Sequence, residues 1–275
     1  PDELKKFVRY RKRAEVLLRV SFRSPTAVCD LSKKFGCAPG DVLGMIEQAR
    51  PLGVRIRGLS FHVGSQATDP AKYVEAVQAC TNLMAEAVLA GLPSLDVLDI
   101  RGGFPVAYNE NVTPIDEFCR PIRAALAKLP PHVRVIAEPG RFIAAPAAIA
   151  VSSVMGKAKR DGRWWYYLDD GLYGSYSGQM FDHAKYPVSV LREGGDLHES
   201  VLAGPTCDSI DVMDESIMLP ELEVGDLVVG RMMGAYTWAS ATDFNFFKRA
   251  KVVVMNEHAD ARRVVRLQRK TASAR

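Results

Sequence analysis

The chain has 275 residues, enough for one large domain or two ordinary ones, with 48% hydrophobic and 25% charged residues and a net charge of +4. The basic runs at residues 11–13 and 262–270 carry no interleaved aromatic residues, a pattern typical of solvated faces, so we expect no nucleic-acid partner. Because no apolar run is long enough to cross a bilayer, we expect no membrane partner either.

Five cysteines without a CxxC pair indicate a reducing compartment, and we expect a cytoplasmic protein. The five histidines show no HxxxH or similar spacing, so we expect no metal site.

The first half of the sequence alternates strands and helices. The predicted strands are residues 15–20, 54–60, 95–100 and 133–137, and the predicted helices are residues 39–50, 69–90 and 114–129. Alternation at roughly forty-residue spacing predicts parallel strands joined by crossover helices, as in a (β/α)₈ barrel. Four strands make half of such a barrel, and residues 1–4 resemble the first turn of a helix with no strand before it. We therefore expect that an upstream segment or another polypeptide completes the barrel.

From about residue 147 the pattern changes to strand-like runs separated by Gly and Asp turns. These runs are residues 149–155, 164–168, 200–203, 226–230 and 251–255. The sequence therefore predicts an α/β plus β fold: a partial barrel over residues 1–146 and a mainly β domain over residues 147–275.

Polar, cationic or glycine-rich groups follow each of the four predicted barrel strands. They are Arg19, residues 62–65, residues 101–105 and residues 138–141. Because the carboxyl ends of barrel strands meet at one face, where the active sites of such barrels lie, these groups predict a functional site.

Glu138 and Arg141 place a carboxylate and a guanidinium three residues apart, just where Pro139 and Gly140 end a strand. Such a pair can hold a cationic ring nitrogen and a phosphate, which suggests pyridoxal phosphate. The backbone amides of Gly102 and Gly103 are candidates for the same phosphate. The alternative is a structural ion pair between Glu138 and Arg141 beside ordinary loop glycines.

His62 and Ser65 follow the second strand, where an imidazole can stack on a cofactor ring and the hydroxyl can approach a phosphate. The alternative for His62 is a buried core residue. Arg19 is a candidate cofactor ligand or an ion-pair partner inside the barrel.

In the β half, Cys207 and Asp208 lie together at a Gly-Pro turn, and a thiol beside a carboxylate suits a proton donor. Asp182 offers a second carboxylate, and two carboxylates can bind the distal ammonium of a substrate. Tyr236 can reach a phosphate, although core packing is the default interpretation for Tyr236 and Phe244.

Eight stretches of this chain, in order, resemble the fold type III pyridoxal-phosphate decarboxylases of basic amino acids, the ornithine/lysine/arginine group. They are LRV at 18–20, FHVGS at 61–65, GGFP at 102–105, AEPGR at 137–141, DGLYGS at 170–175, FDH at 181–183, GPTCD at 204–208 and GAYT at 234–237.

The resemblance implies a head-to-tail homodimer with shared active sites at the subunit interface. It implies that His62 stacks on the pyridine ring of pyridoxal phosphate and that Glu138 holds the ring nitrogen. It further implies phosphate ligands (Ser65, Gly102, Gly103, Arg141 and Tyr236), a proton donor (Cys207), ligands of the substrate ammonium (Asp182 and Asp208) and a wall of the site (Phe244).

Two departures from the family stand out. Arg101 precedes Gly102 and Gly103 where the family has a third glycine, so its side chain either crowds the phosphate loop or adds a phosphate contact. The lysine that bonds to the cofactor in this family belongs to a region before Pro1. We therefore expect the chain alone to lack that bond.

The expected reaction is decarboxylation of L-ornithine to putrescine, a step of polyamine biosynthesis. Lysine or diaminopimelate is the alternative substrate. A non-catalytic regulatory homologue, similar to antizyme inhibitors, is the alternative of another class.

Overall fold

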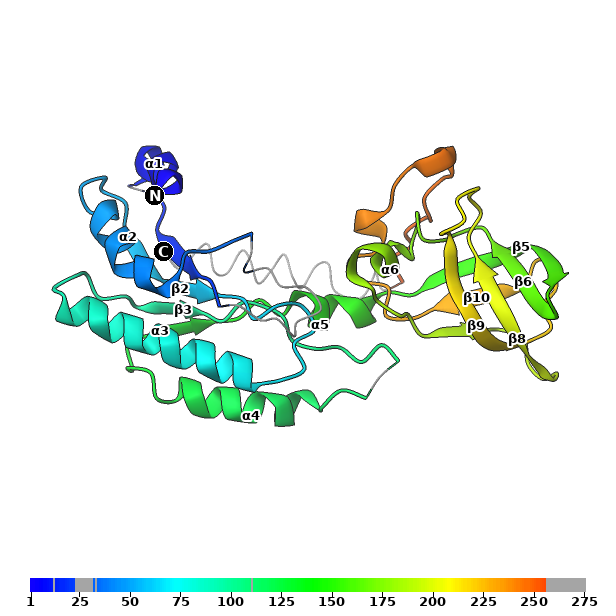
Figure 1. The fold of residues 1–275 in the computed structure, drawn as a ribbon, viewed down its shortest axis with the longest axis horizontal. Helices are drawn as coiled ribbons and strands as arrows, with labels where there is room; N and C mark the ends of the chain where they lie inside the picture. Colours follow the sequence, from blue (N-terminus) through cyan, green and yellow to red (C-terminus); the bar gives the residue numbers. More distant parts are fainter. Residues whose placement is uncertain (12, 23–31, 33, 110, 256–275) are drawn as a thin grey trace.

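The computed structural model describes residues 1–11, 13–22, 32, 34–109 and 111–255. These residues form two lobes that follow one another along the longest axis of the molecule, one α/β and one mainly β (Figure 1). The predicted order of an α/β part followed by a mainly β part is confirmed. The gap between the two sheets, from Ile136 to Ala150, contains the predicted boundary after residue 146, and the division into separate domains stays a prediction.

Among the described residues, the first lobe holds a parallel sheet of four strands in the order β1-β2-β3-β4. The strands are β1 (Val16–Val20), β2 (Ile56–Phe61), β3 (Val97–Asp99) and β4 (Arg134–Ile136). The helices are α1 (Asp2–Phe7), η1 (Val8–Tyr10), η3 (Pro39–Asp41), α2 (Val42–Ala49), α3 (Ala71–Leu89) and α4 (Ile115–Leu126). Because a crossover helix follows each of the first three strands, neighbours in sequence are neighbours in the sheet, and all carboxyl ends face the same way (Figure 1).

Helix α3 has chemically defined ends. The Asp69 carboxylate accepts a hydrogen bond from the backbone N–H of Ala71 at 2.8 Å, and Pro70 precedes the first helical residue. At the other end, Gly91 adopts a φ of +68°, which glycine reaches without strain and which ends the helix. The predicted start lies one to two residues early, since the structure has Ala71 as the first helical residue.

Tyr73 of α3 connects the core of this lobe to the carboxyl edge of the sheet. Its ring is fully buried and contacts three aromatic rings, those of Phe61, Phe104 and Phe118, at centroid distances of 5.2 to 6.4 Å. Its hydroxyl donates to the carbonyl of Gly102 at 3.0 Å, so the same side chain packs the core and supports the loop after β3. Burial raises the pKa of Tyr73 far above its usual range.

Within the described part of the chain, the second lobe holds a mixed sheet of six strands in the order β7-β10-β5-β6-β8-β9. The strands are β5 (Ala150–Arg160), β6 (Arg163–Leu168), β7 (Val188–Val190), β8 (Leu197–Ala203), β9 (Val212–Pro220) and β10 (Leu227–Gly230). Short helices border them: α5 (Gly140–Ala144), η4 (Ala145–Ala147), α6 (Ser177–Asp182), η5 (Trp238–Ser240) and η6 (Phe244–Phe246).

The predicted strand at residues 251–255 is wrong. Val252 to Met255 are 60% to 87% exposed and form no strand, since no neighbouring strand in the described residues pairs with them. Two observed strands, β7 and β9, were not predicted. β7 has only three residues, and the Asp214-Glu215-Ser216 run interrupts the apolar pattern of β9.

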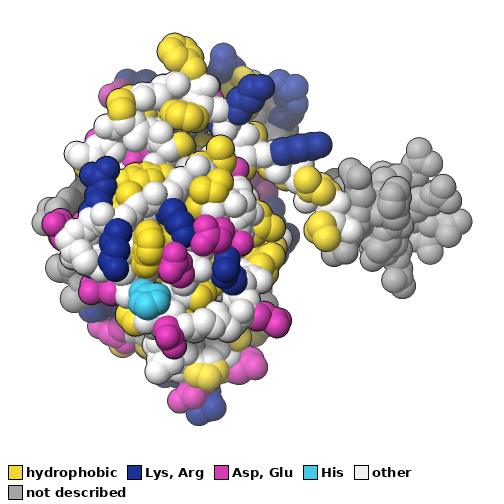
Figure 2. Space-filling view, turned by 90° about the vertical axis from the view of Figure 1, so that its right-hand side faces the viewer, with side chains coloured by type: hydrophobic (Ala, Val, Ile, Leu, Met, Phe, Trp, Pro, Cys, Tyr) yellow, Lys and Arg dark blue, Asp and Glu magenta, His cyan; other side chains and the backbone are white. Residues whose placement is uncertain are grey.

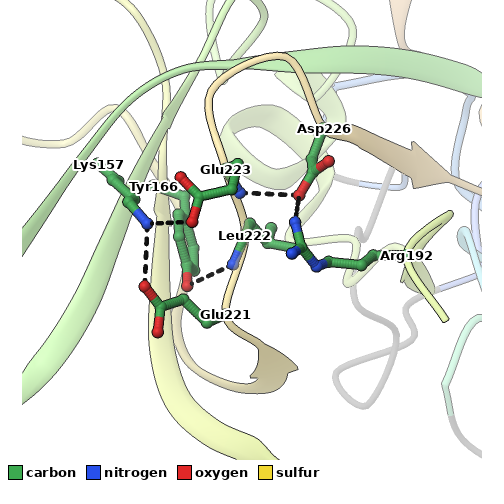
Figure 3. A network of polar contacts seen from close by, with 7 residues as sticks. All are labelled: Lys157, Tyr166, Arg192, Glu221, Leu222, Glu223 and Asp226. Atoms are coloured by element: carbon green, nitrogen blue, oxygen red, sulfur yellow. Dashed lines mark hydrogen bonds and ion pairs between the residues drawn. The ribbon is translucent and has the colours of Figure 1, made fainter. Parts of the chain in front are cut away.

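The turn between β9 and β10 is held by a polar network (Figure 3). Lys157 of β5 contacts Glu221 at 3.0 Å and Glu223 at 2.8 Å, and Arg192 contacts Asp226 at 2.7 Å. The buried hydroxyl of Tyr166 also accepts from the backbone N–H of Leu222 at 3.0 Å. Exposed ion pairs contribute little singly, so the network serves mainly to fix the turn against the sheet.

The end of the molecule at the β lobe carries basic, acidic and hydrophobic side chains interspersed with one another (Figure 2). Within the described residues, no helix is both long and apolar enough to span a membrane.

A prediction follows from Gly58 in β2, where a Cβ atom would lie 2.0 Å from the carbonyl oxygen of Val97. Gly58→Ala forces the two paired strands apart, and we expect it to lower the free energy of unfolding in urea by about 1–3 kcal/mol. Gly44→Ala in α2 is the matched control, because a Cβ there meets nothing within 4 Å and alanine favours the helix by about 0.5–1 kcal/mol. Equal effects of the two substitutions would contradict this account.

Candidate functional site

The loops after β2 and β3 are joined to each other at the carboxyl edge of the sheet. The backbone N–H of Ala67 donates to the carbonyl of Gly103 at 2.9 Å. The Gln66 side-chain amide donates to the carbonyl of Val106 at 2.9 Å and accepts from the backbone N–H of Val106 at 2.8 Å. These bonds fix the positions of the side chains that the two loops carry.

Gly102 and Gly103 lie where only glycine fits. A Cβ on Gly102 would lie 2.6 Å from the carbonyl oxygen of Glu138, and one on Gly103 would lie 2.3 Å from that of Gly64. Gly103 also has a φ of +106°, which side-chain-bearing residues rarely adopt. The loops after β2, β3 and β4 therefore converge here, and His62 Nε2 would be 3.9 Å from a Cβ on Gly102.

His62 is half-buried and neutral. Its Nδ1 accepts the backbone N–H of Gly64 at 3.0 Å, which places the ring proton on Nε2. The pKa of His62 is lowered to about 4, mainly by burial and then by the nearby charges of Arg19 and Arg101, while the charge of Glu138 acts in the opposite direction. Ser65 follows Gly64 in the same loop and is half-buried.

Glu138 pairs with Arg101. Arg101 Nη2 lies 3.3 Å from Glu138 Oε2, and the two side chains are 32% and 50% exposed. The alternative of a structural pair between Glu138 and Arg141 is wrong, because each of the two has another partner. Arg19 lies near this pair, where burial and then the charge of Arg101 lower its pKa.

Arg141, in the first turn of α5, is buried and bound to the second lobe. It donates to Asp182 at 2.8 Å and to the hydroxyl of Tyr108 at 2.9 Å, and its guanidinium lies 4.6 Å from the ring centre of Tyr236. Burial acts against its charge, but the hydrogen bonds to Asp182 and Tyr108 outweigh burial and raise the pKa of Arg141. A predicted phosphate ligand and a predicted substrate ligand therefore contact each other.

Cys207 and Asp208 form a separate group in the β lobe. Tyr173 donates a short hydrogen bond to Asp208, which raises the pKa of Tyr173 to about 12 and lowers that of Asp208. The ring of Phe244 stacks on that of Tyr173 at 4.3 Å. The Cys207 thiol is exposed, and the Asn245 amide donates to its sulfur at 3.2 Å.

Buried Asp211 holds the loop that carries Cys207. Its carboxylate accepts from the backbone N–H of Leu172 at 2.8 Å and from the hydroxyl of Thr206 at 2.7 Å. An open groove of about 1000 Å³ lies beside this loop, and Cys207, Asp208, Arg160, Trp165 and Tyr167 are among its lining residues.

The predicted residues thus fall into three groups. The first lies at the sheet edge (Arg19, His62, Ser65, Gly102, Gly103 and Glu138), the second between the lobes (Arg141, Asp182 and Tyr236) and the third in the β lobe (Cys207, Asp208 and Phe244). Among the described residues, no hydrogen bond or ion pair joins the third group to the first. Sequence reasoning missed Tyr73, Tyr108, Tyr173 and Asn245. Of these, only Tyr173 lies in a stretch singled out from the sequence.

Residues 1–145 match the protein family described as pyridoxal-dependent decarboxylase, pyridoxal binding domain. The chain belongs to this family. Its relatives include the lysine/ornithine decarboxylase of Selenomonas ruminantium, 38% identical over 94% of this chain and 66% of the relative.

Solved structures of amino-acid decarboxylases are also similar to this chain. The lysine/ornithine decarboxylase of Vibrio vulnificus, complexed with cadaverine, is 58% identical with a TM-score of 0.88, covering 94% of this chain and 68% of that one. The arginine decarboxylase of Paramecium bursaria Chlorella virus, bound to agmatine, is 32% identical with a TM-score of 0.81, covering 90% and 68%. The chain thus spans about two thirds of the length of these relatives, and its α/β lobe belongs to the pyridoxal-binding barrel of the family.

The cofactor of the family is pyridoxal phosphate, and the residues at the sheet edge fit it. Gly102 and Gly103 leave a cradle that any Cβ would fill. Arg141 keeps a buried Nε without a hydrogen-bond partner among the described residues, so a donor remains for an anionic ligand.

The described cysteines Cys37, Cys80, Cys119 and Cys207 are unpaired thiols, and the reducing compartment stays a prediction. Cys29 lies outside the described residues. In the described part of the chain, no group of three His, Cys, Asp or Glu side chains has the arrangement of a metal site.

The neutrality of His62 gives a prediction about pH. Because its pKa is lowered from 6.5 to about 4, the unfolded chain binds a proton between these values that the folded chain does not. Stability should therefore fall as pH falls from about 6.5 to about 4, and His62→Asn should reduce that dependence. NMR titration of the ring, assigned with the same variant, should give a midpoint near pH 4, whereas a midpoint near 6.5 would contradict the burial described here.

Proposed function

We propose that this protein catalyses the pyridoxal-phosphate-dependent decarboxylation of a basic amino acid, with L-ornithine as the substrate and putrescine as the product. The convergence of His62, Gly102, Gly103 and Glu138 at one sheet edge carries the proposal. The names of the relatives, which are lysine, ornithine and arginine decarboxylases, support it.

In this proposal Glu138 faces the ring nitrogen as an ionised carboxylate and keeps it protonated. When bound, pyridoxal phosphate supplies an electron-poor ring that accepts the electron pair left by the departing CO₂. The neutral imidazole of His62 would pack against the ring, because a charged imidazole would repel the protonated nitrogen. Arg19 lies beside them and adds positive charge at the same edge.

A second set of residues is assigned to the phosphate. Ser65, the backbone amides of Gly102 and Gly103, Arg141 and Tyr236 would bind it. Arg141 uses one N–H of each terminal nitrogen on Tyr108 and Asp182, so its Nε–H and the second N–H of each terminal nitrogen remain as donors for a phosphate oxygen.

The substrate side of the proposal rests on Asp182, Cys207 and Asp208. One oxygen of Asp182 accepts from Arg141, and the other is without a hydrogen bond among the described residues, so it can bind a distal ammonium. Asp208 would bind the same ammonium, and Cys207 would deliver a proton to the decarboxylated carbon. Phe244, stacked on Tyr173, would wall this end of the site.

The Cys207 group reaches the sheet edge if a second copy of the chain brings it there. We therefore propose a head-to-tail homodimer in which the groove beside Cys207 and Asp208 receives the α/β lobe of the partner. The exposure of Cys207 and the absence of a polar link to the sheet edge of its own chain, among the described residues, support this arrangement.

Two alternatives remain open to test. Lysine is one methylene longer than ornithine. A Cys-Glu pattern at residues 207–208 would resemble diaminopimelate decarboxylases, whereas this chain has Cys-Asp there. A non-catalytic regulatory homologue is favoured by one observation, the ion pair between Arg101 and Glu138, which engages one oxygen of the carboxylate that the ring nitrogen needs.

The test is CO₂ release by the purified full-length protein with pyridoxal phosphate. We expect turnover of L-ornithine above that of L-lysine and none of diaminopimelate. Asp208→Asn should lower the rate with ornithine about thirtyfold or more, because it leaves the distal ammonium without its charge partner.

Asp214→Asn is the matched control. Asp214, like Asp208, accepts a hydrogen bond from the backbone two residues later, but it lies in β9 away from the groove lining. Release from diaminopimelate alone would overturn the substrate assignment, and no release from any of the three would overturn the catalytic one.

A further inference from the structure

Arg101 occupies a backbone position that suits glycine. Its φ is +50°, in the left-handed region where a side chain is unfavourable by roughly 1–2 kcal/mol. The buried carboxylate of Asp99 accepts the backbone N–H of Arg101 at 2.8 Å and so holds this conformation. The side chain is thereby projected in a fixed direction from the end of β3.

That direction leads to Glu138. Arg101 Nη2 contacts Glu138 Oε2 at 3.3 Å, and this is the one ion pair that either side chain forms in the described part of the chain. The Nε of Arg101 is buried without a hydrogen-bond partner there, so the guanidinium is incompletely satisfied. A single long contact between half-exposed groups is weak and can be exchanged for another partner.

We propose that Arg101 is a positioning residue that acts as a displaceable counter-ion of Glu138 and thereby weakens cofactor binding. Arg101 contacts one oxygen of the Glu138 carboxylate, so a protonated ring nitrogen that approaches Glu138 competes with Arg101 for the same negative charge. Once the ring nitrogen has replaced Arg101 at Glu138, Arg101 is without its ion-pair partner. Its positive charge then lies near the positively charged ring nitrogen. The inference rests on the proposed function and adds a control of cofactor affinity to the same site.

The expected effect on cofactor binding separates this role from a phosphate contact. Arg101 gathers with Arg19 around Glu138 and His62, as the shared lowering of the pKa values of His62 and Arg19 reflects. The phosphate is assigned instead to Arg141 and the glycine amides. A phosphate ligand would strengthen cofactor binding, whereas a competitor for Glu138 weakens it, so the two roles predict opposite signs.

The test is a double-mutant cycle with Arg101→Gln, Glu138→Gln and the double variant, using pyridoxal phosphate and pyridoxal as probes in fluorescence titrations of the purified full-length protein. We expect Arg101→Gln to tighten the binding of both probes about fivefold, the size expected for an exposed ion pair. In the Glu138→Gln background the same substitution should have almost no effect. Arg101→Lys, which keeps the charge, should bind both probes like the unmodified chain.

Weaker binding of pyridoxal phosphate but not of pyridoxal by Arg101→Gln would show a phosphate contact and overturn the inference. Equal effects in both Glu138 backgrounds would also overturn it, because Arg101 would then act without Glu138. If binding is measurable but unchanged by Arg101→Gln, the inference fails and the proposed cofactor site stands. If no variant binds either probe, both fail.

A second measurement needs no cofactor. Arg101 lowers the pKa of His62, together with burial and Arg19 and against Glu138, so Arg101→Gln should move the NMR titration midpoint of His62 upward. An unchanged midpoint would show that the Arg101 charge does not lie at the sheet edge and would overturn the inference.

Discussion

The close backbone contacts of Gly102 and Gly103 determine the geometry of the whole site. A carbonyl from each neighbouring loop lies where a Cβ atom would be, so the loops after β2, β3 and β4 approach one another only because these residues have no side chain. The approach brings the imidazole of His62 and the backbone of Glu138 close to Gly102. Tyr73 supports that loop from the core through the carbonyl of Gly102, which links the packing of α3 to the chemistry of the edge.

Each charge assigned to the chemistry already has a partner in the protein. Glu138 contacts Arg101, Arg141 contacts Asp182, and Asp208 accepts from Tyr173. Partnered charges are oriented before a ligand arrives, which favours specific binding, but each ligand group must then compete with a side chain. The competition is sharpest at Glu138, whose partner Arg101 has a backbone conformation that suits glycine, and it is mildest at Arg141, which retains unused donors.

The sequence predicted the strand–helix order and the polar strand ends because both follow from local patterns: the periodicity of apolar residues and the residues that end each strand. It also predicted the cofactor, through motifs in register. It could not predict that Arg101 contacts Glu138 or that Arg141 contacts Asp182, because these contacts join residues 37 and 41 positions apart through the folded backbone. The strand predicted at residues 251–255 failed because β-branched residues favour a strand only where another strand pairs with them.

The central claim is that the Glu138 carboxylate binds the protonated ring nitrogen of pyridoxal phosphate at the carboxyl edge of the parallel sheet. A crystal structure of the full-length protein with pyridoxal phosphate tests it most directly. The account predicts the ring against His62, its nitrogen within hydrogen-bond distance of the Glu138 carboxylate, and the Arg101 guanidinium withdrawn from that carboxylate. A ring nitrogen bound elsewhere, with the contact between Arg101 and Glu138 intact, would contradict it.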